Sequence, residues 1–270
     1  MKSILLSSLF LSFAAATAAP AAITSAGDIM FTGLNTEGND DLAFVLLASY
    51  DANTKIFFSD NEWNTTTLPT PAWNDGNESH FSWSNSANLP AGTIITIGNV
   101  GGTIVGSSAF TSSPTGGTTT LEDGTNRGFS ASGETVYAYL GAAWNTTSPV
   151  FLTVAATGGV GTIPTGYLPA GFALGTNAID LANASFPAVD IGAYTGSRTS
   201  QSSLAAYRPL LANPANWDRQ DTAGDNSIDG IGPDVPFNGT AFSVVPEPGT
   251  PLLLTLVSSF GLLGYRRRLR

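Results

Sequence analysis

Residues 28–34 (DIMFTGL), 42–49 (LAFVLLAS) and 55–59 (KIFFS) decide the fold of this 270-residue chain. Each is a short run of β-branched, aromatic and other apolar residues, and turn-forming Gly, Asn and Asp residues separate the runs. Runs of this length and composition predict β-strands. Because no long amphipathic helix stands between them, they favour an antiparallel sheet over a parallel βαβ arrangement.

The same pattern continues along the chain, with further strands expected at 79–83, 93–97, 135–140, 150–154 and 240–245. Residues 103–133 and 156–178 are dominated by Gly, Thr and Ser, and we expect long loops or edge hairpins there. One short helix is expected over 199–208, and Pro209 should end it. The sequence therefore predicts an all-β protein, an antiparallel β-sandwich with long loops and one short helix.

Both ends of the chain differ from this pattern. Residues 1–22 start with a lysine after the initial Met, continue with an apolar run and finish rich in alanine, which is typical of a secretory signal peptide. Residues 251–265 are apolar, and arginines follow them. An apolar segment with a cationic flank halts export with its end in the cytoplasm. We therefore expect one extracellular domain at 23–245, followed by a tail at 246–270.

The tail resembles the PEP-CTERM sorting signal of Gram-negative bacteria. Its motif is Pro246-Glu247-Pro248, and the hydrophobic transmembrane segment and the stop-transfer arginines follow in the family's order: Arg266, Arg267, Arg268 and Arg270. The resemblance implies export by the Sec machinery, transient insertion in the inner membrane and recognition by an exosortase. The processed protein would reach the cell envelope, the cell surface or the extracellular exopolysaccharide matrix. An ordinary terminal helix or a permanent anchor is the alternative interpretation.

Residues 26–100 carry a second resemblance, to lamin-tail-type, immunoglobulin-like β-sandwich domains of bacterial secreted proteins. It rests on residues 27–33 (GDIMFTG), 39–47 (NDDLAFVLL) and 56–63 (IFFSDNEW). The resemblance implies the fold, and it implies no catalytic residue. Such domains are roughly half the size of 23–245, so enlarged loops are expected here.

Charge and cysteine content exclude several classes of function. The chain has 20 acidic residues against 10 Lys and Arg, a net charge of −10. Nucleic acid is not an expected partner, because phosphate binding needs a cationic surface. An anionic polysaccharide would also be repelled unless divalent cations bridge it. Cysteine is absent, so disulfides and thiolate metal sites are excluded, and stability must come from the core.

Two acidic clusters are candidate calcium sites. Asp225, Ser227 and Asp229 take positions 1, 3 and 5 of a calcium-loop pattern with glycine at position 6, and Asp234 could add an oxygen. The glutamate required at position 12 is missing, so a solvated acidic loop is the alternative. The second, weaker cluster comprises Glu37, Asn39, Asp40 and Asp41. Calcium is thus the one possible cofactor.

Tryptophans offer a second kind of binding site. Trp63, Trp73 and Trp83 recur within a short stretch, and Trp73 lies in a polar segment that predicts an exposed ring. An exposed tryptophan suits a sugar ring or a protein partner. Trp63 and Trp73 are therefore candidate ligand-binding residues, although Trp63 could instead fold over the sheet. Trp83 alternates with Phe81 and is expected in the core.

Catalytic signals are weak. His80, the only histidine, is expected on the face opposite Phe81 and Trp83, at the surface, and no serine-hydrolase elbow accompanies it. Asp60 and Glu62 share a face and could form a glycosidase pair, but a turn at a strand end is the better explanation of them.

We therefore expect a non-enzymatic, exported and exosortase-processed protein with a structural or binding role. The alternative is a carbohydrate-active protein, either a polysaccharide-binding module or a glycosidase.

Overall fold

The computed structural model describes residues 22–64, 72–73, 78, 80–101, 111–123, 128–130, 133–158, 168–182, 185, 187–222 and 224–245. The expected signal peptide, except for its last residue, and the sorting tail lie outside these ranges. Among the described residues, no helix has the length and hydrophobicity needed to cross a membrane.

The first of two large sheets has six strands. They are Ile29–Asn35 (β1), Asp41–Leu46 (β2), Ile94–Gly98 (β7), Thr111–Ser113 (β8), Ile191–Tyr194 (β13) and Trp217–Gln220 (β14). Their order is β14-β13-β1-β2-β7-β8, with antiparallel pairing throughout.

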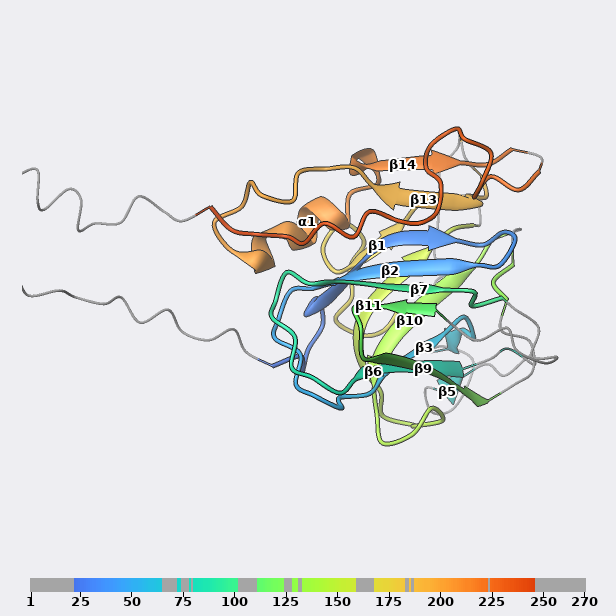
Figure 1. The fold of residues 1–270 in the computed structure, drawn as a ribbon. Coiled ribbons are helices and arrows are strands. Elements are labelled where there is room, and N and C mark those ends of the chain that lie inside the picture. The colour runs from blue at the N-terminus through green and yellow to red at the C-terminus, as the bar shows by residue number, and fades with distance from the viewer. Residues whose placement is uncertain are drawn as a thin grey trace, which may run out of the picture.

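The second sheet also has six strands, and it packs face to face with the first (Figure 1). They are Ile56–Ser59 (β3), His80–Asn85 (β6), Gly117–Asp123 (β9), Thr135–Leu140 (β10), Val150–Ala156 (β11) and Ala178–Asp180 (β12). Their order is β12-β11-β10-β3-β6-β9, and β11 with β12 is its one parallel pair. A small third sheet pairs Trp63–Asn64 (β4) with Ala72–Trp73 (β5).

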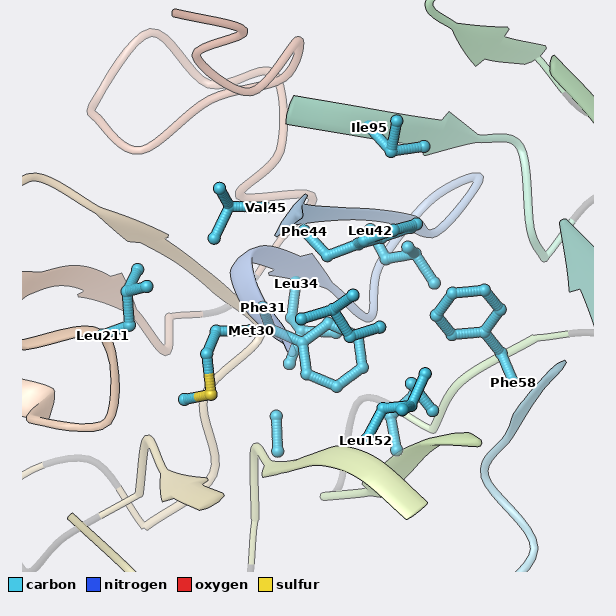
Figure 2. Close-up of a cluster of buried hydrophobic side chains, with 14 of the residues drawn as sticks. Met30, Phe31, Leu34, Leu42, Phe44, Val45, Phe58, Ile95, Leu152 and Leu211 are labelled. Carbon is cyan, nitrogen blue, oxygen red and sulfur yellow. The ribbon is translucent and has the colours of Figure 1, made fainter. Parts of the chain in front are cut away.

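The main core lies between the two large sheets. Phe31 and Phe44 from the first sheet meet Phe58 from the second, with the Phe44 and Phe58 ring centroids 5.3 Å apart (Figure 2). Side chains alternate along each strand, so Phe58 points into this core and Phe57 points to the opposite face. The predicted β-sandwich with one short helix is confirmed at this level. The specific likeness to lamin-tail domains stays a prediction.

The central strands β1 and β2 are buried on both faces, because the C-terminal segment 224–245 covers the outer one. Phe237 from this segment packs on Ala43 and Ile191. A Cβ on Gly33 would lie 2.6 Å from the Phe237 ring, so only glycine permits this contact.

Most expected strands are present with ends shifted by a few residues, but the strand expected at 240–245 is wrong. There the backbone amides of Phe242, Ser243 and Val245 donate to three separate loop carbonyls rather than to one neighbouring strand. Of the segments expected to be loops or edge hairpins, 103–133 contains β8 and β9, and 156–178 ends at the first residue of β12. The β8 and β9 strands form the edges of the two sheets, as an edge hairpin would.

The helical prediction is correct in place and wrong in its boundaries. A 3₁₀ helix spans Leu204–Tyr207, and Arg208–Leu211 (α1) continues it. Pro209 therefore lies inside the first turn of α1 instead of ending the helix, because a first-turn residue needs no amide donor. A second 3₁₀ turn spans Pro214–Asn216.

Both ends of the described domain lie at one end of the sandwich (Figure 1). Ala22 forms a β-bridge with Ser49, shortly after β2. The Phe242 amide donates to the Gly92 carbonyl, and the Gly92 amide donates to the carbonyl of Leu46 at the end of β2. The loops after β1 and β3 lie at the opposite end.

Candidate functional site

The outer face of the second sheet is aromatic rather than polar. Phe57, Tyr137, Tyr139 and Phe151 point outward from β3, β10 and β11 and form a second buried cluster. Strands β4 and β5 cover it, with the Trp63 and Phe151 ring centroids 5.2 Å apart. An aromatic face of this size is stable only when covered, so it positions the segments above it.

Trp63 and Trp73, the two predicted ligand-binding tryptophans, are brought together by this cover. They face each other across the β4–β5 pair with ring centroids 5.1 Å apart. Trp63 is only 5 % exposed. The expectation that Trp73 stands exposed is wrong, since it is half-buried and packs 4.9 Å from the Tyr139 ring. The sequence around Trp73 is polar, so its apolar neighbours come from distant strands.

His80 is 1 % exposed, which corrects the prediction of a surface histidine. It does point to the face opposite Phe81 and Trp83, but that face is covered. Its Nδ1 lies 2.9 Å from the Tyr139 hydroxyl, which donates to the Trp144 carbonyl at 2.8 Å. The hydroxyl has one proton and gives it to that carbonyl, so Nδ1 must carry the proton in the first bond.

A cavity of about 230 Å³ opens beside His80. We name it the aromatic pocket; its lining residues include Asn61, Trp73, Glu78, His80, Asp123 and Trp144. Trp144 comes from the loop between β10 and β11, and its ring centroid lies 4.9 Å from that of His80. The hydrogen bond from Tyr139 to its carbonyl holds this loop over the sheet.

Asn61 and Trp73, which both line the pocket, each have a buried polar atom without a hydrogen-bond partner among the described residues. The side-chain oxygen of Asn61 is buried and unpaired, and Asn61 as a whole is 2 % exposed. The indole nitrogen of Trp73 is also buried and unpaired. Buried polar atoms in native proteins almost always pair with protein, water or a ligand, so these two atoms and the adjoining cavity make this the candidate binding site.

Burial raises the pKa of carboxyl groups near the pocket. Burial raises the pKa of Asp60 to about 8, and the charges of Glu134 and Glu78 raise it further. Burial likewise raises the pKa of Glu134 to about 7. The charge of Glu62 also raises both values, and the suggested glycosidase pair of Asp60 and Glu62 stays a hypothesis. Asp60 is 4 % exposed and is not one of the residues that line the pocket.

The two predicted acidic clusters meet at this same end of the sandwich. We name Glu37, Asp40, Asp190 and Asp225 around Asn226 the acidic end. The Asn226 amide nitrogen donates to Glu37 and to Asp190, each at 3.1 Å. Gly38, with a φ of +64°, brings the backbone so close that a Cβ would lie 2.7 Å from the Asp225 carboxylate.

Burial also raises carboxyl pKa values at the acidic end. Asp40 is 4 % exposed and has a pKa of about 7, although the Phe129 amide donates to it at 2.7 Å. Burial and the charges of Glu37 and Asp221 raise the pKa of Asp190 to about 6. Cavities of about 450 Å³ and 400 Å³ adjoin these residues, and exposed Asn39 and half-buried Asp41 line the smaller one.

The four residues proposed for calcium do not converge on one point. Asp225 accepts from the backbone amide and hydroxyl of Ser227, and Asp229 accepts from the Ile231 amide at 2.7 Å. These are turn-forming bonds within the loop. Asp234 has a buried carboxylate oxygen with no partner. Within the described ranges, no group of three or more His, Cys, Asp or Glu side chains is arranged to hold a metal ion. Calcium stays a prediction.

Sequence reasoning missed Asn61, Trp144 and Asn226. Trp144 lies in a short hairpin loop where a tryptophan has no local reason to be, and this was an available signal. Asn61 and Asn226 occur in turn-forming segments, so nothing in the sequence separates them from ordinary turn residues.

The sorting motif Pro246-Glu247-Pro248 and the terminal arginines lie outside the described residues. Comparison of the chain with protein-family models, with curated proteins and with solved structures finds no significant match.

Proposed function

We propose that this chain is an exported protein of the cell surface or extracellular matrix, sorted through its C-terminal tail, and that it acts by binding rather than by catalysis. The sequence of the tail carries the first part of the proposal. Its motif, apolar run and terminal arginines stand in the order of an exosortase substrate. Exopolysaccharide or another matrix protein is the proposed partner.

The geometry of the domain is consistent with this role. The first and last described residues lie at one end of the sandwich, and the loops after β1 and β3 lie at the other (Figure 1). These two loops contribute Glu37 to the acidic end and Asn61 to the aromatic pocket. A domain held through either terminus would therefore present both polar regions away from its attachment. The strongly negative surface also keeps such a protein soluble outside the cell.

The position of Asp60 does not favour it as the general acid of the glycosidase alternative. Asp60, the carboxyl with the highest pKa next to the pocket, is buried and does not line the cavity. His80 uses Nδ1 for the Tyr139 hydroxyl. A general acid must come within hydrogen-bond reach of its substrate, and Asp60 lacks that access.

The intact mass of the protein, recovered from the membranes and the medium of the organism that makes it, tests the sorting proposal. We expect a species that starts near residue 23 and ends near Pro246 to Pro248, in the matrix or medium. A Glu247→Ala variant should keep the tail, whereas the neighbouring Thr250→Ala variant should be processed normally. A wild-type species that retains Arg270 and sediments with membranes would reject exosortase sorting.

A further inference from the structure

Two side chains that line the aromatic pocket have a polar atom without a hydrogen-bond partner among the described residues. The Asn61 side-chain oxygen needs a donor, and the Trp73 indole N–H needs an acceptor. Leaving a buried polar group unpaired costs about 1–3 kcal/mol. A ligand that completes both groups must therefore both donate and accept, as a hydroxyl group does. An ammonium ion donates only, and a carboxylate or phosphate ester accepts only.

The charges around the pocket exclude anions. Glu78 and Asp123 line the cavity, and none of the described lining residues is a lysine or arginine. Lys55 is paired at 2.8 Å with Glu122, the neighbour of Asp123 in the chain. A negatively charged ring would meet two carboxylates with no cation to offset them. These carboxylates instead suit a ligand with several O–H donors.

Flat rings supply the remaining surface. The His80 ring packs against Trp73 on one side and Trp144 on another, with centroid distances of 5.1 and 4.9 Å. Trp144 is half-buried, so part of its ring is accessible. Its carbonyl is fixed by Tyr139, and Trp73 is fixed by Trp63. Rigid aromatic faces bind the apolar C–H side of a sugar ring at low ordering cost.

From these observations we propose that the aromatic pocket binds one uncharged, hydroxyl-rich sugar ring. The volume of about 230 Å³ is below the range of about 300–1,000 Å³ for pockets that hold drug-sized ligands, which fits a single ring. The inference rests on the proposed function, which places the pocket outside the cell beside polysaccharide. The ligand is then a neutral sugar unit of that polymer.

Titration of the purified full chain in a polyoxyethylene detergent tests this proposal without any dependence on tail processing. The probes are the neutral monosaccharides released by acid hydrolysis of the organism's own polysaccharide, with glucuronate and choline as charged comparisons. Tryptophan fluorescence and calorimetry report binding. We expect at least one neutral sugar to bind, and glucuronate and choline not to bind. Choline binding without sugar binding would overturn the proposal in favour of an ammonium site, and no binding by any neutral sugar would also overturn it.

Two variants separate a binding role from a structural one. Trp144→Ala should weaken sugar binding by roughly tenfold or more. Val150→Ala, at an exposed position where the same hairpin re-enters the sheet, should leave binding unchanged. Asn61→Leu should remove binding and leave the melting temperature unchanged or higher, because it deletes an unpaired buried oxygen. Lost stability together with retained binding in Asn61→Leu would show that Asn61 serves the fold alone.

The two proposals can fail separately. A protein that binds sugar but keeps Arg270 would reject exosortase sorting and retain the pocket assignment. A correctly processed protein that binds no neutral sugar would reject the pocket assignment and retain exosortase sorting.

Discussion

The aromatic pocket and the acidic end are both clusters of polar groups at the same end of the sandwich, and they differ in how their hydrogen bonds are completed. At the acidic end, protein N–H groups pair the carboxylates: Asn226 donates to Glu37 and Asp190, and the Phe129 amide donates to Asp40. In the aromatic pocket, the side chains of Asn61 and Trp73 each have a buried atom without a partner.

This difference indicates different roles for the two regions. Completed networks hold loops in place, and here the acidic end ties the segment around Asn226 to the loop after β1. Where hydrogen bonds beside a cavity are incomplete, a ligand can supply the missing partners. The pocket is thus the better candidate for recognition, and the acidic end the better candidate for stability.

Among single substitutions, the largest expected effect comes from replacing Asn226, the central hydrogen-bond donor of the acidic end, with an acceptor. Asn226→Asp places a third carboxylate between Glu37 and Asp190, and we expect a loss of about 3–5 kcal/mol in the free energy of unfolding at neutral pH. Urea denaturation measures it. The control is Asn238→Asp, an exposed turn residue whose side-chain oxygen accepts from the Thr240 amide, and it should change stability by less than about 0.5 kcal/mol. Equal effects of the two changes would contradict the structural role of the acidic end.

The next effect is a loss of stability as pH rises from 5 to 8. The raised pKa values of Asp60 (about 8), Asp40 (about 7), Glu134 (about 7) and Asp190 (about 6) mean that the folded state binds protons more tightly than the unfolded chain. Their contribution is complete below the unfolded value near pH 4 and is lost as pH rises through each folded pKa. Each group contributes at most about 1.4 kcal/mol per pH unit.

Two variants divide this pH dependence between the regions. Asp60→Asn should reduce the fall of the melting temperature with pH up to about pH 8. Asp190→Asn should reduce this fall only up to about pH 6. Thermal melting across this range measures both. A wild-type protein that becomes more stable from pH 5 to 8 would show that these carboxyls are ionised in the fold.

A smaller effect is expected from the hydroxyl that links the pocket histidine to its loop. Tyr139→Phe leaves the His80 Nδ1 proton and the Trp144 carbonyl without this partner, which should cost about 1–3 kcal/mol. Tyr194→Phe is the matched control, because its hydroxyl donates one bond, to the Ser197 carbonyl, and its loss should cost about 1 kcal/mol. If Tyr139→Phe also weakens sugar binding, the hydroxyl positions Trp144; unchanged binding would limit it to stability.

Calcium should have the smallest effect. The carboxylates of the acidic end already accept hydrogen bonds, so we expect weak binding that raises the melting temperature at pH 8 by less than about 4 °C, reversibly with chelator. Asp225→Asn should remove this shift, and Asp123→Asn in the aromatic pocket should not. A shift that depends on Asp123 would assign the calcium site to the aromatic pocket instead. Identical melting with and without calcium would contradict a calcium site at the acidic end.

Strand positions were predictable where strands are apolar on one or both faces. The runs at β1, β2 and β3 appear as expected because burial leaves an apolar signature in the sequence. The edge strand β14, with the sequence WDRQ, has no such signature, and its strand state depends on pairing with β13. The segment 240–245 has the composition of a strand but lies where no neighbouring strand is available.

The candidate site divides in the same way. Trp73 and the two acidic clusters were recognisable as residues of interest, but their surroundings were not. The polar sequence near Trp73 predicts exposure, and the buried aromatic face that covers it comes from β3, β10 and β11. Likewise, residues 37–41 and 225–229 are far apart in the chain, and only the fold unites them.

By itself, the sequence determined the strand-rich domain, the excess of negative charge, the absence of thiol chemistry and the composition of the two ends, because these are properties of local residue pattern and count. The tertiary structure alone decided that His80 is buried, that Trp144 folds over it, and that Asn61 is left unpaired beside a cavity while Asn226 is fully paired. Hydrogen-bond completion depends on which distant segments meet, and no local pattern encodes that.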